Sequence, residues 1–246
     1  MNKTIDLIAA PYDSAHYNKR MGAGPLRLVD NGLIEHLSDE GFKVNYKKLI
    51  VEEEFLTEIA STIQLLIKIK HAIIESIQNA SFPLVLSGNC CASVGVGAAL
   101  KNDNVGVAWF DAHGDCETPG TTQNGFLDGM GLSMLLFSSW QNLLSSFDLR
   151  SAIPGRNVAL IGARDLSMHE ENFIASKEIS HLTVEKIIQS KESIIENTCS
   201  QLSKRGVNQL HLHVDVDVLD PSIAPANSYA VNNGLDKADL SRSLNY

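Results

Sequence analysis

The sequence predicts an α/β fold in which a mainly parallel sheet carries helices on its faces. Two patterns predict it: short apolar runs of strand length recur along the chain, and stretches with helical periodicity lie between them. Regular alternation of strands and helices indicates a parallel sheet. In such sheets ligands bind just beyond the carboxyl ends of the strands, so we expect the chemistry of this protein there.

Short apolar runs mark six expected strands, which are residues 5–9, 44–49, 84–86, 105–110, 158–161 and 210–218. Helical periodicity marks four expected helices, which are residues 26–37, 55–79, 132–137 and 184–202. No linker, repeat or low-complexity tract interrupts this alternation. We therefore expect residues 1–246 to form a single domain.

The composition is that of a globular protein with a sizeable core. Apolar residues make up 44% of the chain and charged residues 20%. A net charge of -9 argues against nucleic acid or an anionic membrane as a partner. Four cysteines are too few for a disulfide scaffold, and no apolar run has the length of a membrane span or the form of a secretory leader. A cytoplasmic protein is predicted.

A motif of three polar residues follows the expected strand 105–110. Asp111, His113 and Asp115 are spaced by two, and residues two apart in an extended chain point the same way. The ordinary alternative is a capping aspartate, a core histidine and a solvated loop aspartate. Three ligand-type side chains directly after a buried strand favour a metal site over that alternative.

A second polar row lies on the expected strand 210–218. His211, His213, Asp215 and Asp217 alternate with apolar residues. Two buried carboxylates repel each other unless a cation compensates their charge, so the two aspartates favour a metal site. The histidines lie deeper along the strand and are expected to be hydrogen-bonded core residues or supports for the ligands. Oxygen-rich ligation with one or two nitrogens suits Mn²⁺ and similar ions better than structural zinc, and carboxylates can bridge two ions.

Together, DAHGD (111–115) and DVDVLDPSIAP (215–225) closely resemble the paired signatures of the arginase/agmatinase (ureohydrolase) family. MGAGPLRL (21–28), LSGNCCASVG (86–95) and IGARDLSMHE (161–170) resemble further family segments in the same order. The resemblance implies a three-layer α/β/α fold of the arginase type. It also implies a homo-oligomeric hydrolase that uses two manganese ions to cleave a C–N bond of a guanidino, amidine or amide-like small molecule.

The resemblance assigns six metal ligands, which are Asp111, His113, Asp115, Asp215, Asp217 and Cys90. Asp111 and Asp215 would bridge the two ions, Asp115 would bind the first ion, and His113 and Asp217 would bind the second. Cys90 stands where the family has a histidine. A thiolate there would favour Zn or Fe; an empty first site would leave one ion, as in histone-deacetylase-like amidohydrolases; or Cys90 is an ordinary buried residue.

The positions that contact substrate in the family carry unusual residues here. Glu117 and Asn124 fall where arginases contact the amino-acid end of arginine. Ser167 replaces an aspartate that reads the α-amino group, and Glu170 matches an acidic family position. A substrate other than arginine is therefore expected. Asp128 replaces a proton-shuttling histidine, and it could relay protons or cap the helix that follows.

Family members continue beyond the last residue of this chain with a further strand and helices. Either the chain is truncated, or the protein lacks these elements and the guanidinium contact that the family makes from them, which would leave an exposed sheet edge. This end, together with Cys90 and Asp128, leaves a second functional hypothesis open. In it, the protein binds metal as an arginase-like protein with weak or no catalysis.

Overall fold

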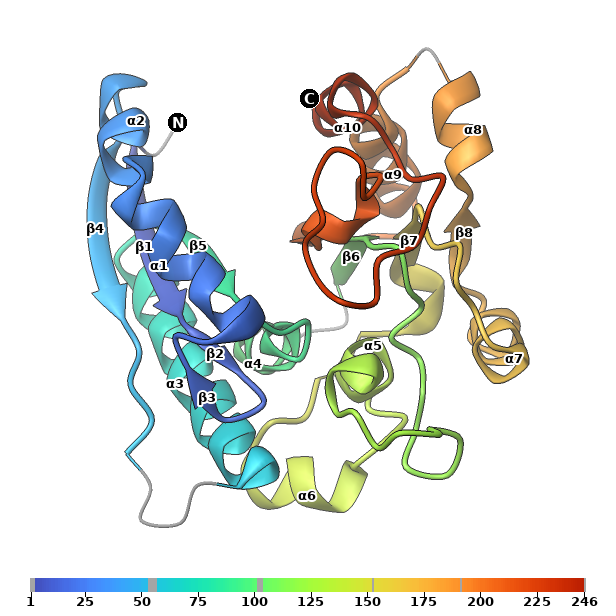
Figure 1. Ribbon diagram of the computed structural model, residues 1–246, viewed down its shortest axis with the longest axis horizontal. Helices are drawn as coiled ribbons and strands as arrows, with labels where there is room; N and C mark the ends of the chain where they lie inside the picture. The colour runs from blue at the N-terminus through green and yellow to red at the C-terminus, as the bar shows by residue number, and fades with distance from the viewer. Residues whose placement is uncertain (1–2, 53–56, 101–103, 152, 191, 246) are drawn as a thin grey trace. The chain divides into compact units, whose positions relative to one another are not determined.

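The structure is a computed structural model that describes residues 3–52, 57–100, 104–151, 153–190 and 192–245 (Figure 1). The chain divides into two compact units. Unit 1 comprises Met1–Leu100 and Gln141–Arg150, and unit 2 comprises Lys101–Trp140 and Ser151–Tyr246. Each unit has its own parallel sheet and its own apolar core. The single domain expected from the sequence stays a prediction.

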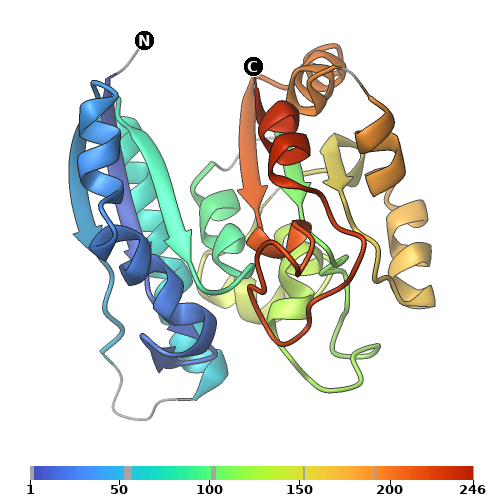
Figure 2. The same cartoon turned by 45° about the horizontal axis from the view of Figure 1, so that its top comes forward.

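Unit 1 is built on a three-stranded parallel sheet in the order β4-β1-β5. Its strands are β1 (Thr4–Ala10), β4 (Lys43–Lys48) and β5 (Phe82–Ser87), with a short antiparallel pair β2 (Tyr12–Asp13) and β3 (His16–Tyr17). Its helices are α1 (Gly24–Asp30), α2 (Leu33–Asp39), α3 (Glu58–Gln78), α4 (Ala92–Leu100) and α6 (Gln141–Ser146). Figures 1 and 2 show α1 and α2 on one face of the sheet and α3 on the other.

The core of unit 1 lies between β1 and α3. Helix α3 begins after Thr57, whose hydroxyl accepts the N–H of Ala60, and it buries Leu65, Ile69 and Ile73 against Ile8 of β1. Burying four such side chains removes most of their surface from water, and each contributes about 1.5–3 kcal/mol to stability. The helix that the periodicity predicted is therefore present, and these three side chains fix it on β1.

Unit 2 is built on a four-stranded parallel sheet in the order β8-β7-β6-β9. Its strands are β6 (Val105–Phe110), β7 (Val158–Ile161), β8 (Ser180–Leu182) and β9 (Gln209–Val214). Its helices are α5 (Gly131–Leu135), α7 (Met168–Ser176), α8 (Val184–Gln189), α9 (Ile194–Ser203) and α10 (Lys237–Leu244). Every residue of β6 is buried, and Phe110 packs with Ile187 of α8 and Ile194 of α9 in one apolar cluster.

The predicted α/β class is confirmed, and the expected strands 105–110 and 158–161 have the observed bounds of β6 and β7. The expected strand 210–218 is wrong at its end. Strand β9 stops at Val214 because the Asp215 carboxylate accepts the N–H of Asp217 at 2.7 Å, which starts a 3-10 turn over Val216–Val218. Strands β2, β3 and β8 were not predicted.

Two expected helices are each observed as a pair. Residues 26–37 divide into α1 and α2 at Gly32, whose φ of +90° is a left-handed conformation that favours glycine. Residues 184–202 divide into α8 and α9. Residues 55–56 of the expected helix 55–79 lie outside the described residues. Within the described ranges, no helix combines the length and apolarity that crossing a bilayer requires.

Candidate metal centre

The ends of β6 and β9 bring the two polar motifs of the sequence together. These strands are parallel neighbours, and Phe110, the last residue of β6, pairs with Val214, the last residue of β9. Asp111 and Asp215 are therefore the first residues beyond the sheet on each strand. The N–H of Asp215 donates to the carbonyl of Phe110 at 2.8 Å. The carboxyl ends of two strands thus meet, as expected from the sequence.

Three ligand-type atoms converge at this sheet edge. His113 Nδ1 lies 3.4 Å from Asp111 Oδ1 and 3.2 Å from Asp217 Oδ2, and all three residues offer ligand atoms within 4.8 Å of one another. Two ligand atoms that bind the same ion at about 2.1 Å lie about 3.0–3.4 Å from each other when the angle at the ion is between 90° and the tetrahedral value. The observed distances therefore fit one shared cation.

Backbone and side-chain donors hold this trio in place. One oxygen of Asp217 accepts the N–H of Ala112 at 3.0 Å, and the other accepts the amide of Asn227 at 2.8 Å. His113 Nε2 lies 3.1 Å from the carbonyl of Tyr229. A proton on Nε2 would satisfy that carbonyl and leave the Nδ1 lone pair for a cation, which is the usual arrangement of a metal-binding histidine.

The carboxylates of Asp111 and Asp217 favour a positive charge at His113 or beside it. Burial alone would lower the pKa of His113, but its hydrogen bonds with Asp111 and Asp217 raise that pKa to about 11. Burial alone would raise the pKa of Asp111, but its interactions with His113 and His213 hold it below the ordinary value. A proton on His113 offsets part of the negative charge of the two carboxylates, and a divalent cation would do so more completely.

Asp115 adds a buried carboxylate to the same region. It is 7% exposed, and its Oδ2 has no hydrogen-bond partner among the described residues. Burial, followed by the negative charges of Asp111 and Asp128, raises the pKa of Asp115 well above its usual range. Its φ of +50° is left-handed, and its carbonyl accepts the N–H of Leu132 at 2.9 Å. A buried carboxylate oxygen without a donor is what a cation would satisfy.

The two histidines of β9 differ in their surroundings. His213 stacks on Trp109 with ring centroids 3.8 Å apart, and its Nε2 lies 3.8 Å from Asp111 Oδ2. Trp109 Nε1 donates to the same oxygen of Asp111 at 3.1 Å. His211 is half-buried, and desolvation of its ring lowers its pKa to about 3. Of the two histidines, His213 is the one that reaches the carboxylates at the strand ends.

Three of the four predicted substrate residues form a second cluster, the loop cluster, which consists of Glu117, Ser167 and Glu170 together with Thr121. The Ser167 hydroxyl lies 2.8 Å from Glu117 Oε1 and 3.1 Å from Glu170 Oε2. The other oxygen of Glu117 accepts the Thr121 hydroxyl at 2.5 Å. Asn124 lies apart, in an exposed turn where its side-chain carbonyl accepts the N–H of Phe126 at 2.8 Å.

Ser167 and Glu170 also form the capping box of α7. The Ser167 hydroxyl accepts the N–H of Glu170, and the Glu170 carboxylate accepts the N–H of Ser167 at 3.0 Å. This role was missed in the sequence, although the spacing S-x-x-E in SMHE is its usual signal. Both residues therefore have a structural function, whatever they contact in a substrate.

Asp128 is buried, and it begins a 3-10 turn, Asp128–Met130, that leads into α5. The residue that caps α5 is Met130, and no side chain makes a cap hydrogen bond there. The prediction that Asp128 caps this helix is therefore wrong. Its proposed part in proton transfer stays a prediction. Cys90 belongs to unit 1, where it is buried in the turn between β5 and α4, and its assignment as a ligand also stays a prediction.

Arg164 is a positioning residue that the sequence analysis overlooked. Its guanidinium donates to the carbonyls of Asp217 at 3.0 Å, Val231 at 2.7 Å and Asn232 at 3.1 Å. Burial lowers the pKa of Arg164. Arg164 therefore connects the turn that carries Asp217 with residues 231–232 through hydrogen bonds to both.

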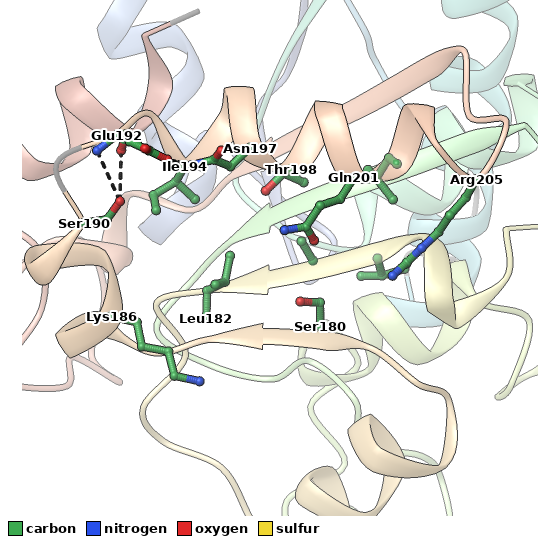
Figure 3. A pocket seen from close by; sticks show the side chains of 13 residues that line it. Ser180, Leu182, Lys186, Ser190, Glu192, Ile194, Asn197, Thr198, Gln201 and Arg205 are labelled. Atoms are coloured by element: carbon green, nitrogen blue, oxygen red, sulfur yellow. Dashed lines mark hydrogen bonds between the residues drawn. The ribbon is translucent and has the colours of Figure 1, made fainter.

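A cavity of about 390 Å³ lies elsewhere in unit 2, between β7, β8, α8 and α9 (Figure 3). Its wall includes Ser180, Leu182, Thr198 and Gln201. None of the predicted site residues lines it. The cavity therefore carries no part of the predicted chemistry.

Known proteins resemble this chain over nearly its whole length. The model of the Arginase family matches residues 3–246. The arginase of Staphylococcus aureus (strain COL) is 34% identical, covering 95% of this chain and 81% of its own length. The arginase of Bacillus subtilis (strain 168) is 32% identical, covering 96% and 82%. A crystal structure of arginase from Bacillus subtilis has a TM-score of 0.87 at 28% identity, covering 98% of this chain and 84% of that one.

These similarities confirm the predicted three-layer α/β/α fold of the arginase type. The family consists of hydrolases that act on C–N bonds of small molecules, and dependence on a pair of manganese ions is a property of the family. The curated relatives are arginases, so the expectation that arginine is not the substrate finds no support in them. The chain belongs to the arginase family.

Proposed function

We propose that this protein is a metal-dependent hydrolase that cleaves a C–N bond of a guanidino compound. The observation that supports the proposal is the convergence of Asp111, His113 and Asp217 beside the buried Asp115 oxygen that lacks a donor among the described residues. With Asp215, these residues would hold two Mn²⁺ ions, because carboxylate-rich ligation suits that ion. Cys90 is proposed as a further ligand from its place in the sequence alone.

Divalent ions, when bound here, would supply Lewis-acid activation of water and neutralise charge that develops on the substrate. The chain contributes the positions of the ligands. Arg164 and Asn227 hold Asp217 from its carbonyl and its carboxylate. Asp128 is our candidate for the group that protonates the leaving amine, because it is buried and close enough for its charge to raise the pKa of Asp115.

The loop cluster guides the proposal for the substrate. The Glu117 carboxylate lies against Ser167, so a negative charge lies at the positions that contact the far end of the substrate in the family. A carboxylate there favours a substrate whose far end carries an ammonium group. Arginine has such a group, and the curated relatives at 34% and 32% identity are arginases. We therefore include arginine among the candidate substrates.

The test is an assay of released urea with Mn²⁺-loaded protein and three compounds: arginine, agmatine and 4-guanidinobutyrate. We expect turnover of arginine or agmatine and poor turnover of 4-guanidinobutyrate, whose far end is anionic. Asp111→Asn should lower the rate at least about 1,000-fold, because it removes a charge from the centre. The exposed Asp30→Asn is the matched control and should keep full activity. No hydrolysis under any divalent metal would contradict the proposal.

A centre with one ion is the second candidate. It is favoured by the fact that Asp111, His113 and Asp217 form a three-ligand set by themselves. Three protein ligands and an open position are typical of catalytic zinc sites. Metal analysis separates the candidates, since two equivalents of manganese support the first and one equivalent of zinc supports the second. The cytoplasmic location and the homo-oligomer stay predictions.

A further inference from the structure

We infer that His213 is a nitrogen ligand of the first metal ion, in a position that the family's ligand pattern does not use. The inference rests on the proposed metal-dependent function. Its starting point is the carboxylate of Asp111, whose two oxygens face two different imidazoles. Oδ1 lies 3.4 Å from His113 Nδ1, and Oδ2 lies 3.8 Å from His213 Nε2.

The distance between His213 and Asp111 suits two ligands of one ion. At 3.8 Å, it is too long for a hydrogen bond between the two atoms. Two atoms that each bind a metal at about 2.1 Å are separated by about 3.0 Å at 90° and about 3.8 Å at 130°. An ion between Asp111 Oδ2 and His213 Nε2 would make Asp111 a bridge, with its other oxygen on the ion bound by His113.

The imidazole of His213 is held in this direction by its neighbours. His213 pairs directly with Trp109 across β6 and β9, and the two rings stack at an interplanar angle of 20°. The Trp109 indole also donates to Asp111 Oδ2 at 3.1 Å, so one residue fixes both the ring and the carboxylate. The His213 side chain is 13% exposed, and ring rotation would break the stack. Such preorganisation is usual for a metal ligand and its supports.

The first ion has no nitrogen ligand among the residues that the resemblance assigns to it. Cys90 stands where the family has the imidazole of the first ion, which leaves that ion with carboxylates as its other assigned ligands. An imidazole from β9 would restore a nitrogen donor from a different element of the fold. The first ion would then bind an imidazole and carboxylates, without the thiolate that favours softer ions.

His211 provides a matched control on the same strand. It lies two residues before His213 on the same side of β9, it is half-buried as His213 is, and its ring centroid is 6.4 Å from that of His213. It shares residue type and strand face with His213, but it belongs to none of the groups of metal-ligating side chains found among the described residues. Replacing each histidine by serine therefore compares a proposed ligand with a neighbour of the same kind.

The experiment counts the Mn²⁺ ions bound by chelator-treated protein, using calorimetry and electron paramagnetic resonance. Unaltered protein and His211→Ser should bind two ions with a spin-coupled spectrum. His213→Ser should weaken one ion at least about tenfold and give the spectrum of an isolated ion. Two ions of unchanged affinity in His213→Ser would overturn the inference alone. No ion on unaltered protein would overturn the proposed function as well.

A second measurement needs no substitution, in case His213→Ser does not fold. Pulsed electron paramagnetic resonance on protein labelled with ¹⁵N-histidine counts the imidazole nitrogens bound to manganese. Two coupled nitrogens, from His113 and His213, support the inference. A single coupled nitrogen overturns it.

Discussion

Unit 2 contains two acidic clusters, which are the loop cluster and a strand-end cluster of Asp111, Asp115, Asp215 and Asp217. Their carboxylates differ in the hydrogen-bond donors around them. In the loop cluster, Glu170 accepts the N–H groups of Cys116 at 3.2 Å and Ser167 at 3.0 Å, and Glu117 lies against two hydroxyls. At the strand ends, the buried Oδ2 of Asp115 has no donor among the described residues. Carboxylates that already have donors need no cation, whereas a buried oxygen without one does.

The difference has an origin in the local backbone. Glu170 lies in the first turn of α7, where N–H groups without helical partners are available. Asp115 follows the parallel strand β6, where the chain has left the sheet, and no donor among the described residues reaches its Oδ2. The same residue type is thus a helix cap in one place and a candidate metal ligand in the other. The role of an acidic residue can therefore be inferred only when the helix, strand or loop that carries it is known.

The largest expected effect is the stabilisation of the protein against thermal unfolding by Mn²⁺. The ion would bind the carboxylates of the strand-end cluster and not those of the loop cluster, which already have donors. At a free concentration of about 100 times Kd, binding stabilises the folded state by about 2.7 kcal/mol, or about 5–10 °C in Tm for a chain of this size. Scanning calorimetry with and without Mn²⁺ measures the shift. Asp115→Asn, which removes a ligand of one of the two proposed ions, should reduce the shift, and the exposed Glu171→Gln should keep it in full. An equal shift in Asp115→Asn would mean that the ion binds elsewhere.

The next effect is the pH dependence of metal-free protein. The pKa of His113 is raised to about 11 in the folded state, against about 6.5 in the unfolded chain. The folded state therefore binds this proton more tightly, and its stabilisation is complete below about pH 6.5 and is lost as pH rises toward about 11. Urea unfolding at about pH 7, 8 and 9 should show a decline of at most about 1.4 kcal/mol per pH unit.

Substitution of His113 separates this proton from others. His113→Ala should flatten the decline, and the exposed His169→Ala should preserve it. Mn²⁺ should weaken the decline in unaltered protein, because the ion competes with the proton for the same imidazole. A decline of the same slope in His113→Ala would assign the dependence to other groups.

The sequence predicted those parts of the site that depend on short-range pattern. Asp111 and His113 were found because an apolar run of six residues ends directly before them, and β6 has the predicted bounds. The support of Asp217 could not be predicted in the same way. Its donors Ala112 and Arg164 lie 105 and 53 residues away in the chain, and no local pattern indicates that they meet.

His213 illustrates the same limit. Its alternation with apolar residues predicted an inward-facing histidine on a strand. The register of β9 against β6 makes Trp109 its direct partner and brings it beside Asp111. Register between strands distant in the chain depends on the packing of the whole sheet, so a core residue and a ligand look alike in the sequence.

The smallest expected effect tests whether the two clusters are independent. Ser167→Ala removes the α7 cap and a hydroxyl from both Glu117 and Glu170, so it should lower the free energy of unfolding by about 1 kcal/mol in urea. Ser176→Ala, near the end of the same helix, removes an exposed hydroxyl and should cost less. Both variants should bind Mn²⁺ as unaltered protein does, because the donors of the loop cluster serve no ion. Weaker binding in Ser167→Ala alone would show that the capping box also positions the strand-end carboxylates.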